Sequence, residues 1–257
     1  MQFMIAASTD VGIVKKTNQD SYLVKRLNTP IGEVVFAVLC DGMGGLQKGE
    51  VASATIVKAF EHWAVERLPK CAQTAIQDSD IRRDWLDLVN TYNEKIKLYG
   101  QQLGVSLGTT VTAILLTPNR YFILNVGDTR AYEISDSVRL LTKDQTVVAR
   151  EVEQGLLTEA EARRDKRRSV LLQCIGASKV VYPDLFFGET KLNAVYLLCS
   201  DGFRHEITVE ELSAYLTPDM MTDSLVLKRQ IDSLIELNKQ RMERDNLTAL
   251  TVRTYSL

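Results

Sequence analysis

The chain has 257 residues, which is enough for a large hydrophobic core, and its 45% hydrophobic and 25% charged residues are typical of a soluble globular protein. A formal net charge of −2 excludes nucleic-acid binding that depends on an overall basic field. No apolar run approaches the ~20 residues of a membrane span, and the first residues lack the features of a secretory signal.

The first part of the chain predicts three strands followed by two helices. Apolar runs typical of strands occur at residues 3–8, 20–25 and 34–40. The last run does not alternate with polar residues, so both of its faces should be buried. Apolar residues then recur with helical spacing over residues 51–63 and 81–99, and we expect Trp63 and Trp85 to pack against a sheet.

The rest of the chain predicts a β meander, a charged region and a final mixture of helices and strands. Residues 110–116, 121–126 and 130–134 predict three strands joined by tight turns, and therefore a meander. Residues 145–170 are charged and more helical than extended. A strand at 195–199, helices near 208–216 and 221–240, and a strand at 247–254 complete the chain. Strands in blocks that are separated by pairs of helices favour an α+β protein.

Four aspartates occur where strands end or turns begin: Asp20, Asp41, Asp201 and Asp245. Asp41 and Asp201 directly follow apolar strand-like runs, so their carboxylates should lie at the edge of a sheet. Ionised carboxylates that cluster repel one another unless a cation lies between them. Because two of the aspartates are near the start of the chain and two near its end, a shared metal site requires one domain that spans residues 1–257.

Oxygen ligands without a nearby Cys or His favour Mg²⁺ or Mn²⁺ over Zn²⁺. Two such ions ~4 Å apart can lower the pKa of a bridging water and direct it at a phosphate ester. Gly42, Gly44 and Gly45 would let the backbone approach the ions, and a peptide carbonyl there could be a ligand. Each aspartate taken alone is more typical of an ordinary turn than of a metal ligand.

Six segments together resemble the metal-dependent serine/threonine protein phosphatases, the PPM or type 2C family, in its bacterial branch. The segments are residues 12–20, 41–45, 108–110, 127–130, 200–202 and 245–248, in the family's order over nearly the whole chain. The resemblance implies a four-layer αββα sandwich in which two central antiparallel sheets are flanked by helix pairs. It also implies a flap near residues 145–178.

The resemblance implies roles for individual residues by match of position. Two ions, Mn²⁺ or Mg²⁺, would be held by Asp20, Asp41, Asp201, Asp245 and the carbonyl of Gly42. Asp41 would bridge both ions, and Asp128 would hold a third. Lys15 would bind the substrate phosphate and would be catalytic together with Asp41 and Asp201. The implied reaction is direct hydrolysis of phosphoserine and phosphothreonine by a metal-activated hydroxide, without a phosphoenzyme.

Three residues depart from the family pattern: Lys15, Gln19 and His205. Lys15 lacks the bidentate fork of the usual arginine, and Gln19 replaces a frequent glutamate. His205 stands where many relatives have an aspartate that helps to hold the third metal. Met43 leaves no histidine beside Asp41, so a water would have to protonate the leaving alkoxide. These departures leave open a pseudophosphatase that binds phosphoproteins or a kinase without turnover.

We expect a phosphatase that acts on phosphorylated proteins and opposes a serine/threonine protein kinase, with no nucleic-acid or membrane partner, as a monomer. An enzyme specialised for one phosphorylated anti-sigma-type partner is a narrower alternative. The basic run at residues 163–168 could dock acidic phosphopeptides, although its acidic neighbours favour a solvated helix end. Four cysteines without Cys-x-x-Cys spacing indicate reduced thiols, so we expect a cytoplasmic location.

Overall fold

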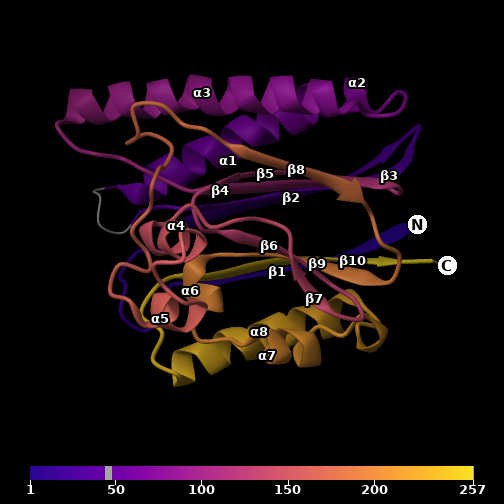
Figure 1. Cartoon of the computed structure of the whole chain (residues 1–257). Helices are drawn as coiled ribbons and strands as arrows, with labels where there is room; N and C mark the ends of the chain where they lie inside the picture. The colour runs from indigo at the N-terminus through magenta and orange to yellow at the C-terminus, as the bar shows by residue number, and fades with distance from the viewer. Residues whose placement is uncertain (44–47, 257) are drawn as a thin grey trace.

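The computed structural model describes residues 1–43 and 48–256, which form two stacked antiparallel sheets with helices on both outer faces (Figure 1). One sheet contains β2 (Asp20–Thr29), β3 (Gly32–Asp41), β4 (Val111–Leu116), β5 (Arg120–Val126) and β8 (Asp184–Glu189). The other contains β1 (Gln2–Asp10), β6 (Arg130–Ile134), β7 (Val138–Leu140), β9 (Ala194–Cys199) and β10 (Leu247–Tyr255). The α+β sandwich expected from the sequence is confirmed.

Helices cover the outer face of each sheet. The first sheet is covered by α1 (Gly49–Glu66), α2 (Leu68–Cys71) and α3 (Asp78–Leu103). Over the second sheet lie α7 (Val209–Tyr215), a 3₁₀ turn (Pro218–Met220) and α8 (Ser224–Gln240). The short helices α4 (Val147–Glu153), α5 (Glu159–Arg164) and α6 (Asp201–Arg204) lie together at one end of the sandwich (Figure 1). No helix of the described residues has the length and apolar character needed to cross a membrane.

The two ends of the chain meet in one sheet. The strand order of that sheet is β1-β10-β9-β6-β7, and β1 pairs with β10 along its whole length. Gln2 lies opposite Tyr255 at one end of the pair, and Asp10 lies opposite Leu247 at the other. This pairing brings residues from the start and the end of the chain to the same edge, as a shared site requires (Figure 1).

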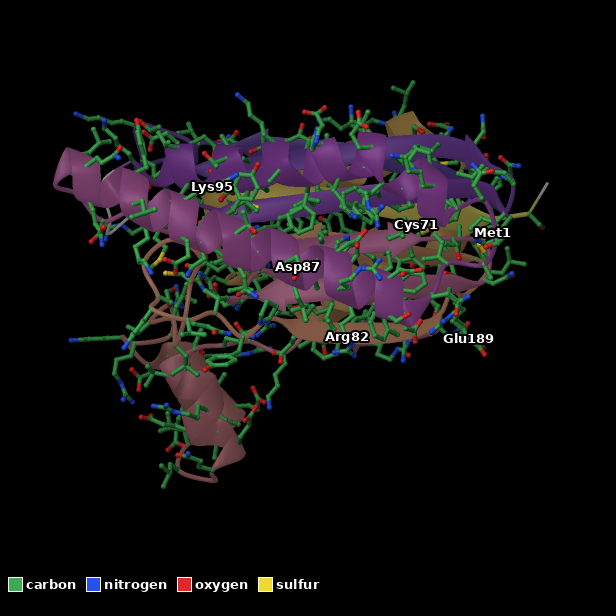
Figure 2. The ribbon with its side chains drawn as sticks, turned by 90° about the horizontal axis from the view of Figure 1, so that it is seen from above. Met1, Cys71, Arg82, Asp87, Lys95 and Glu189 are labelled. Carbon is green, nitrogen blue, oxygen red and sulfur yellow. The ribbon has the colours of Figure 1, made fainter. Side chains whose placement is uncertain are left out.

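The apolar run of β3 does not alternate with polar residues because both faces of the strand are buried. Even-numbered residues from Val34 to Cys40 pack under α1 and α3, whereas the odd-numbered residues between them pack against the second sheet. All seven are fully buried. Phe36 lies with its ring centroid 5.2 Å from that of Trp63 and 5.9 Å from that of Trp85, so both tryptophans belong to the core. Figure 2 shows α1 and α3 crossing this face of the sheet side by side.

The predicted meander over residues 110–134 is wrong at its third strand. β4 and β5 pair as expected, but β6 pairs with β7 and β9 in the other sheet. The connection crosses between the layers, where two threonines hold it. In β4, Thr112 Oγ1 donates to the Thr129 carbonyl at 2.9 Å, and just before β4 the hydroxyl of Thr110 lies 2.7 Å from that of Thr129. The length of the turn between β5 and β6 does not reveal such hydrogen bonds between the two sheets.

The charged region after β7 is helical, as predicted. Each of its helices begins at a threonine that caps it: Thr146 Oγ1 accepts from the Ala149 N–H at 3.1 Å, and Thr158 forms a capping box with Glu161. In the basic run that follows, Arg167 pairs with Glu151 at 2.7 Å and with Asp165 at 2.8 Å. Part of the run is therefore neutralised by its own neighbours.

Candidate metal centre

Strand ends bring the four predicted aspartates to one end of the sandwich. Asp20 is the first residue of β2 and lies opposite Asp41, the last residue of β3. Asp201 begins α6 directly after β9, and Asp245 lies just before β10, the strand that pairs with β9. The structure therefore brings together residues that are more than 200 positions apart in the sequence.

Two glycines are required where these segments meet. A Cβ on Gly202 would lie 2.2 Å from the Asn246 carbonyl oxygen and 3.1 Å from the Cβ of Asp245. A Cβ on Gly42 would lie 2.5 Å from the carbonyl group of Gly49. Any larger residue would push these segments apart, so the glycines set how closely the aspartates approach one another. Gly44 and Gly45 lie outside the described residues.

The carboxylates act strongly on one another. Burial raises the pKa of Asp20 to about 7 against the effect of a hydrogen bond from Thr248, and the charges of Asp201 and Asp245 add to the rise. Burial and the charges of Asp20 and Asp201 raise the pKa of Asp41 well above its ordinary value. Asp201 behaves differently, because His205 and Arg204 outweigh its burial and lower its pKa.

Asp20 has one oxygen that lacks a partner. Its Oδ2 accepts from Thr248 Oγ1 at 2.5 Å, whereas Oδ1 is buried and has no hydrogen-bond partner in the structure. A buried carboxylate oxygen without a donor is costly unless a proton or a cation reaches it. This oxygen and the oxygen-only donor set fit Mg²⁺ or Mn²⁺.

Two of the other carboxylates contact protein donors. Asp245 Oδ1 lies 2.7 Å from Lys15 Nζ, and Asp201 Oδ2 accepts from Ser169 Oγ at 3.1 Å. With the side chains so arranged, no group of three or more His, Cys, Asp or Glu residues within 1–43 and 48–256 is placed to hold a metal ion. The four aspartates lie at the same end of the sandwich. Before they could bind an ion together, their side chains would have to turn toward one another.

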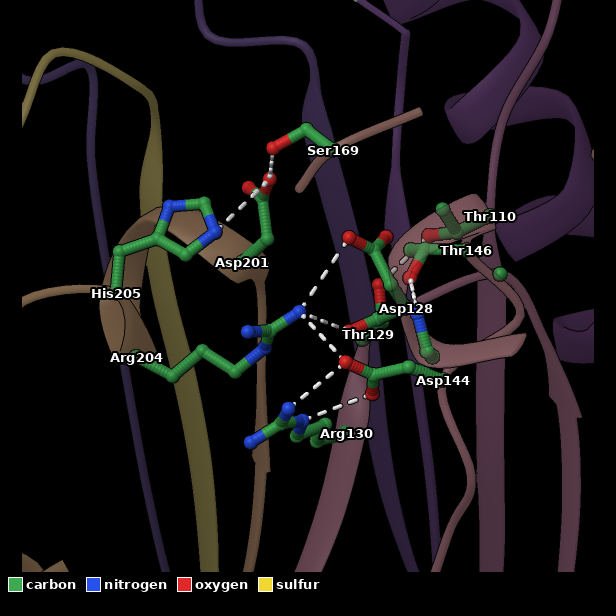
Figure 3. A network of polar contacts seen from close by, with 12 residues as sticks. Thr110, Asp128, Thr129, Arg130, Asp144, Thr146, Ser169, Asp201, Arg204 and His205 are labelled. Atoms are coloured by element: carbon green, nitrogen blue, oxygen red, sulfur yellow. Dashed lines mark hydrogen bonds and ion pairs between the residues drawn. The ribbon is translucent and has the colours of Figure 1, made fainter. Parts of the chain in front are cut away.

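Asp128 has a different environment from the four aspartates. It is buried at the crossing between β5 and β6, and its Oδ2 lies 3.4 Å from Arg204 Nη2 (Figure 3). The same Nη2 lies 3.2 Å from Asp144 Oδ2, and Asp144 also pairs with Arg130 at 2.8 Å. Burial and the charge of Asp201 raise the pKa of Asp128 to about 7, although Arg204 opposes the rise.

Sequence reasoning missed the residues that support the site. Asn246 is the clearest case: its Oδ1 accepts from the Gln19 N–H at 2.9 Å, and its Nδ2 donates to the carbonyls of Val11 at 3.0 Å and Thr17 at 3.2 Å. These bonds hold the segment that carries Lys15. Asn246 stood in a recognised motif, but only the fold reveals its partners, which lie more than 200 positions away.

Comparisons with known proteins cover nearly the whole chain. The family model for protein phosphatase 2C matches residues 13–247. The serine/threonine protein phosphatase PstP of Mycobacterium tuberculosis strain H37Rv is 31% identical over 247 residues, which are 95% of this chain and 44% of that relative. The chain therefore spans less than half the length of this curated relative.

Solved structures agree with this match. The serine/threonine phosphatase of S. agalactiae superimposes with a TM-score of 0.83 at 28% identity, covering 98% of this chain and all of that one. The catalytic domain of PstP, solved in complex with two manganese ions, gives a TM-score of 0.79 at 27% identity, covering 99% of both chains. The family model spans most of the chain and every aspartate discussed above. The chain belongs to the bacterial protein phosphatase 2C family.

Proposed function

We propose that this chain is a Mn²⁺- or Mg²⁺-dependent phosphatase that hydrolyses phosphoserine and phosphothreonine in proteins. The supporting observation is that buried carboxylates from both ends of the chain meet at one end of a type 2C phosphatase fold. Two ions would be held by Asp20, Asp41, Asp201, Asp245 and the Gly42 carbonyl. When bound, such ions supply an activated water and neutralise the charge on phosphate oxygens.

Several residues of the chain would prepare the site. The backbone of Asp41 is fixed on both sides, because its N–H donates to Thr110 Oγ1 at 3.0 Å and its carbonyl accepts from the Thr110 N–H at 2.9 Å. This support would hold the Asp41 carboxylate in place. Met43 leaves no histidine beside it, so a water would protonate the leaving alkoxide.

Lys15 would hold the substrate phosphate. Burial works against its charge, but Asp245 and then Asp41 and Asp201 raise its pKa, so its ammonium stays protonated at neutral pH. Lys15 would have to exchange Asp245 for the phosphate. The alternative function is a pseudophosphatase, which the departures at Lys15, Gln19 and His205 leave open.

We propose that the chain, as one phosphatase domain over residues 1–257, acts on phosphorylated proteins and opposes a serine/threonine kinase. Residues 145–178 would serve as a flap, since Ser169 within it contacts Asp201. A cytoplasmic location and a monomeric state stay predictions from the sequence.

The test is release of phosphate from a phosphothreonine peptide in the presence of Mn²⁺. We expect the wild type to be active and chelator to abolish the activity. Asp41→Asn keeps the shape of the side chain but removes its charge, so we expect a loss of at least about 10²–10³-fold with the fold retained. The matched control is Asp136→Asn, at an aspartate whose side chain is 97% exposed, and it should retain full activity.

Two outcomes would contradict the proposal in different ways. Normal turnover by a folded Asp41→Asn variant would remove Asp41 from the site. A wild type that binds the phosphopeptide but releases no phosphate at any Mn²⁺ concentration would establish the pseudophosphatase instead.

A further inference from the structure

A buried arginine lies beside the candidate centre. Arg204 is the last residue of α6, and its side chain is 10% exposed. Its Nη2 donates to the Asp128 carbonyl at 3.1 Å and lies within 3.4 Å of carboxylate oxygens of Asp128 and Asp144 (Figure 3). A guanidinium stays protonated in proteins, so a full positive charge is fixed at this point.

Arg204 belongs to a buried cluster of arginines and carboxylates. Two arginines, Arg130 and Arg204, face two carboxylates, Asp128 and Asp144 (Figure 3). Arg130 grips Asp144 with two hydrogen bonds of 2.8 Å, which leaves Arg204 as the cation nearest to Asp128. A divalent ion added here would bring two further positive charges to a buried site that already holds two arginines, and that is costly.

A metal ion and this guanidinium would also compete for the same atoms. A hard divalent cation needs carboxylate oxygens at about 2.0–2.6 Å, and it would repel a guanidinium nitrogen that lies 3.4 Å from the same Asp128 oxygen. Figure 3 shows the Arg204 guanidinium joined by dashed lines to Asp128 and Asp144, whereas Asp201 contacts Ser169 and His205. The guanidinium therefore already contacts an Asp128 carboxylate oxygen for which a third ion would have to compete.

His205 does not supply a replacement ligand beside Asp128. Its Nε2 lies 3.7 Å from Asp201 Oδ2, and its Nδ1 lies 3.5 Å from Glu243 Oε2. Both ring nitrogens thus face carboxylates other than Asp128. The residues around Asp128 do not fit a third divalent ion.

We propose that Arg204 supplies the positive charge beside Asp128 in place of a third divalent ion, so that Asp128 binds no metal in this chain. The inference rests on the proposed function only for the ions held by the other four aspartates. It replaces the metal role that the family resemblance implies for Asp128, and it makes Arg204 a residue that determines how many ions the protein binds.

The test counts bound Mn²⁺ by the loss of the electron paramagnetic resonance signal of free Mn²⁺ during titration. We expect the wild type and Asp128→Asn to bind the same number of ions. Arg204→Gln should bind one ion more, because it frees the Asp128 carboxylate, and adding Asp128→Asn to that variant should abolish the gain. Arg130→Gln is the matched control, since Arg130 belongs to the same network but contacts Asp144 rather than Asp128, and it should gain no ion.

Two results would overturn the inference. One is an ion that the wild type binds and Asp128→Asn loses. The other is an Arg204→Gln variant that is folded by circular dichroism and gains no ion. If Arg204→Gln does not fold, the comparison of the wild type with Asp128→Asn decides alone. Failure of the proposed function is distinguishable, because it appears as an ion count that Asp41→Asn leaves unchanged.

Discussion

Burial of the Asp20 carboxylate at the site lowers the stability of the fold. Its raised pKa of about 7 means that the native protein holds this proton more tightly than the unfolded chain, whose aspartates titrate near 3.9. Between these two values the native state binds more protons, so the free energy of unfolding falls as the pH rises. Above pH 7 Asp20 is charged in both the native and the unfolded state, and the full free-energy cost of burying that charge lowers the stability.

The variant Asp20→Asn isolates this contribution. In the presence of chelator, we expect the substitution to raise the free energy of unfolding on the order of a few kcal/mol at pH 8, and by less at pH 5. The measurement is urea unfolding at both pH values. Asp87→Asn, on the exposed face of α3, serves as the control and should show no such difference. An equal effect of Asp20→Asn at both pH values would contradict the assignment.

At the scale of elements, the segment that carries Lys15 depends on Asn246. Its side chain makes three hydrogen bonds to residues 11–19, and each such bond contributes about 1 kcal/mol. Asn246→Ala should therefore lower the free energy of unfolding by about 1–3 kcal/mol and raise KM for a phosphopeptide more than it lowers kcat. Asn28→Ala, at an exposed position of β2, should leave both nearly unchanged. Unaltered stability in the Asn246 variant would show that these bonds do not hold the segment.

The elements that the sequence predicted well are those with a strong local pattern. The uninterrupted apolar run of β3 and the helical spacing of α1 and α3 each follow from burial of their own side chains. β6 was placed in the wrong sheet because bonds from Thr110 and Thr112 in another layer decide its position. β8 and α6 were not predicted: the first is only half-buried, and the second has four residues.

The same distinction applies to the site. The positions of the four aspartates were predicted from strand ends and from motif order. In the structure, the ends of β2 and β3 in one sheet lie near α6 and the segment before β10 of the other. The contact between Arg204 and Asp128 could not be predicted, because the two residues are 76 positions apart and belong to no shared motif. Long-range partners of this kind depend on how the sheets are stacked.

At the scale of the whole molecule, the account depends on both ends of the chain meeting at one edge of the sandwich. Divalent ions bound there would link β2 and β3 to α6 and the segment before β10. The most direct measurement is an anomalous-difference map from crystals that contain Mn²⁺. The account predicts two strong peaks about 4 Å apart among Asp20, Asp41, Asp201 and Asp245, and none beside Asp128. A map without peaks among these four aspartates, or with its strongest peak elsewhere, would contradict it.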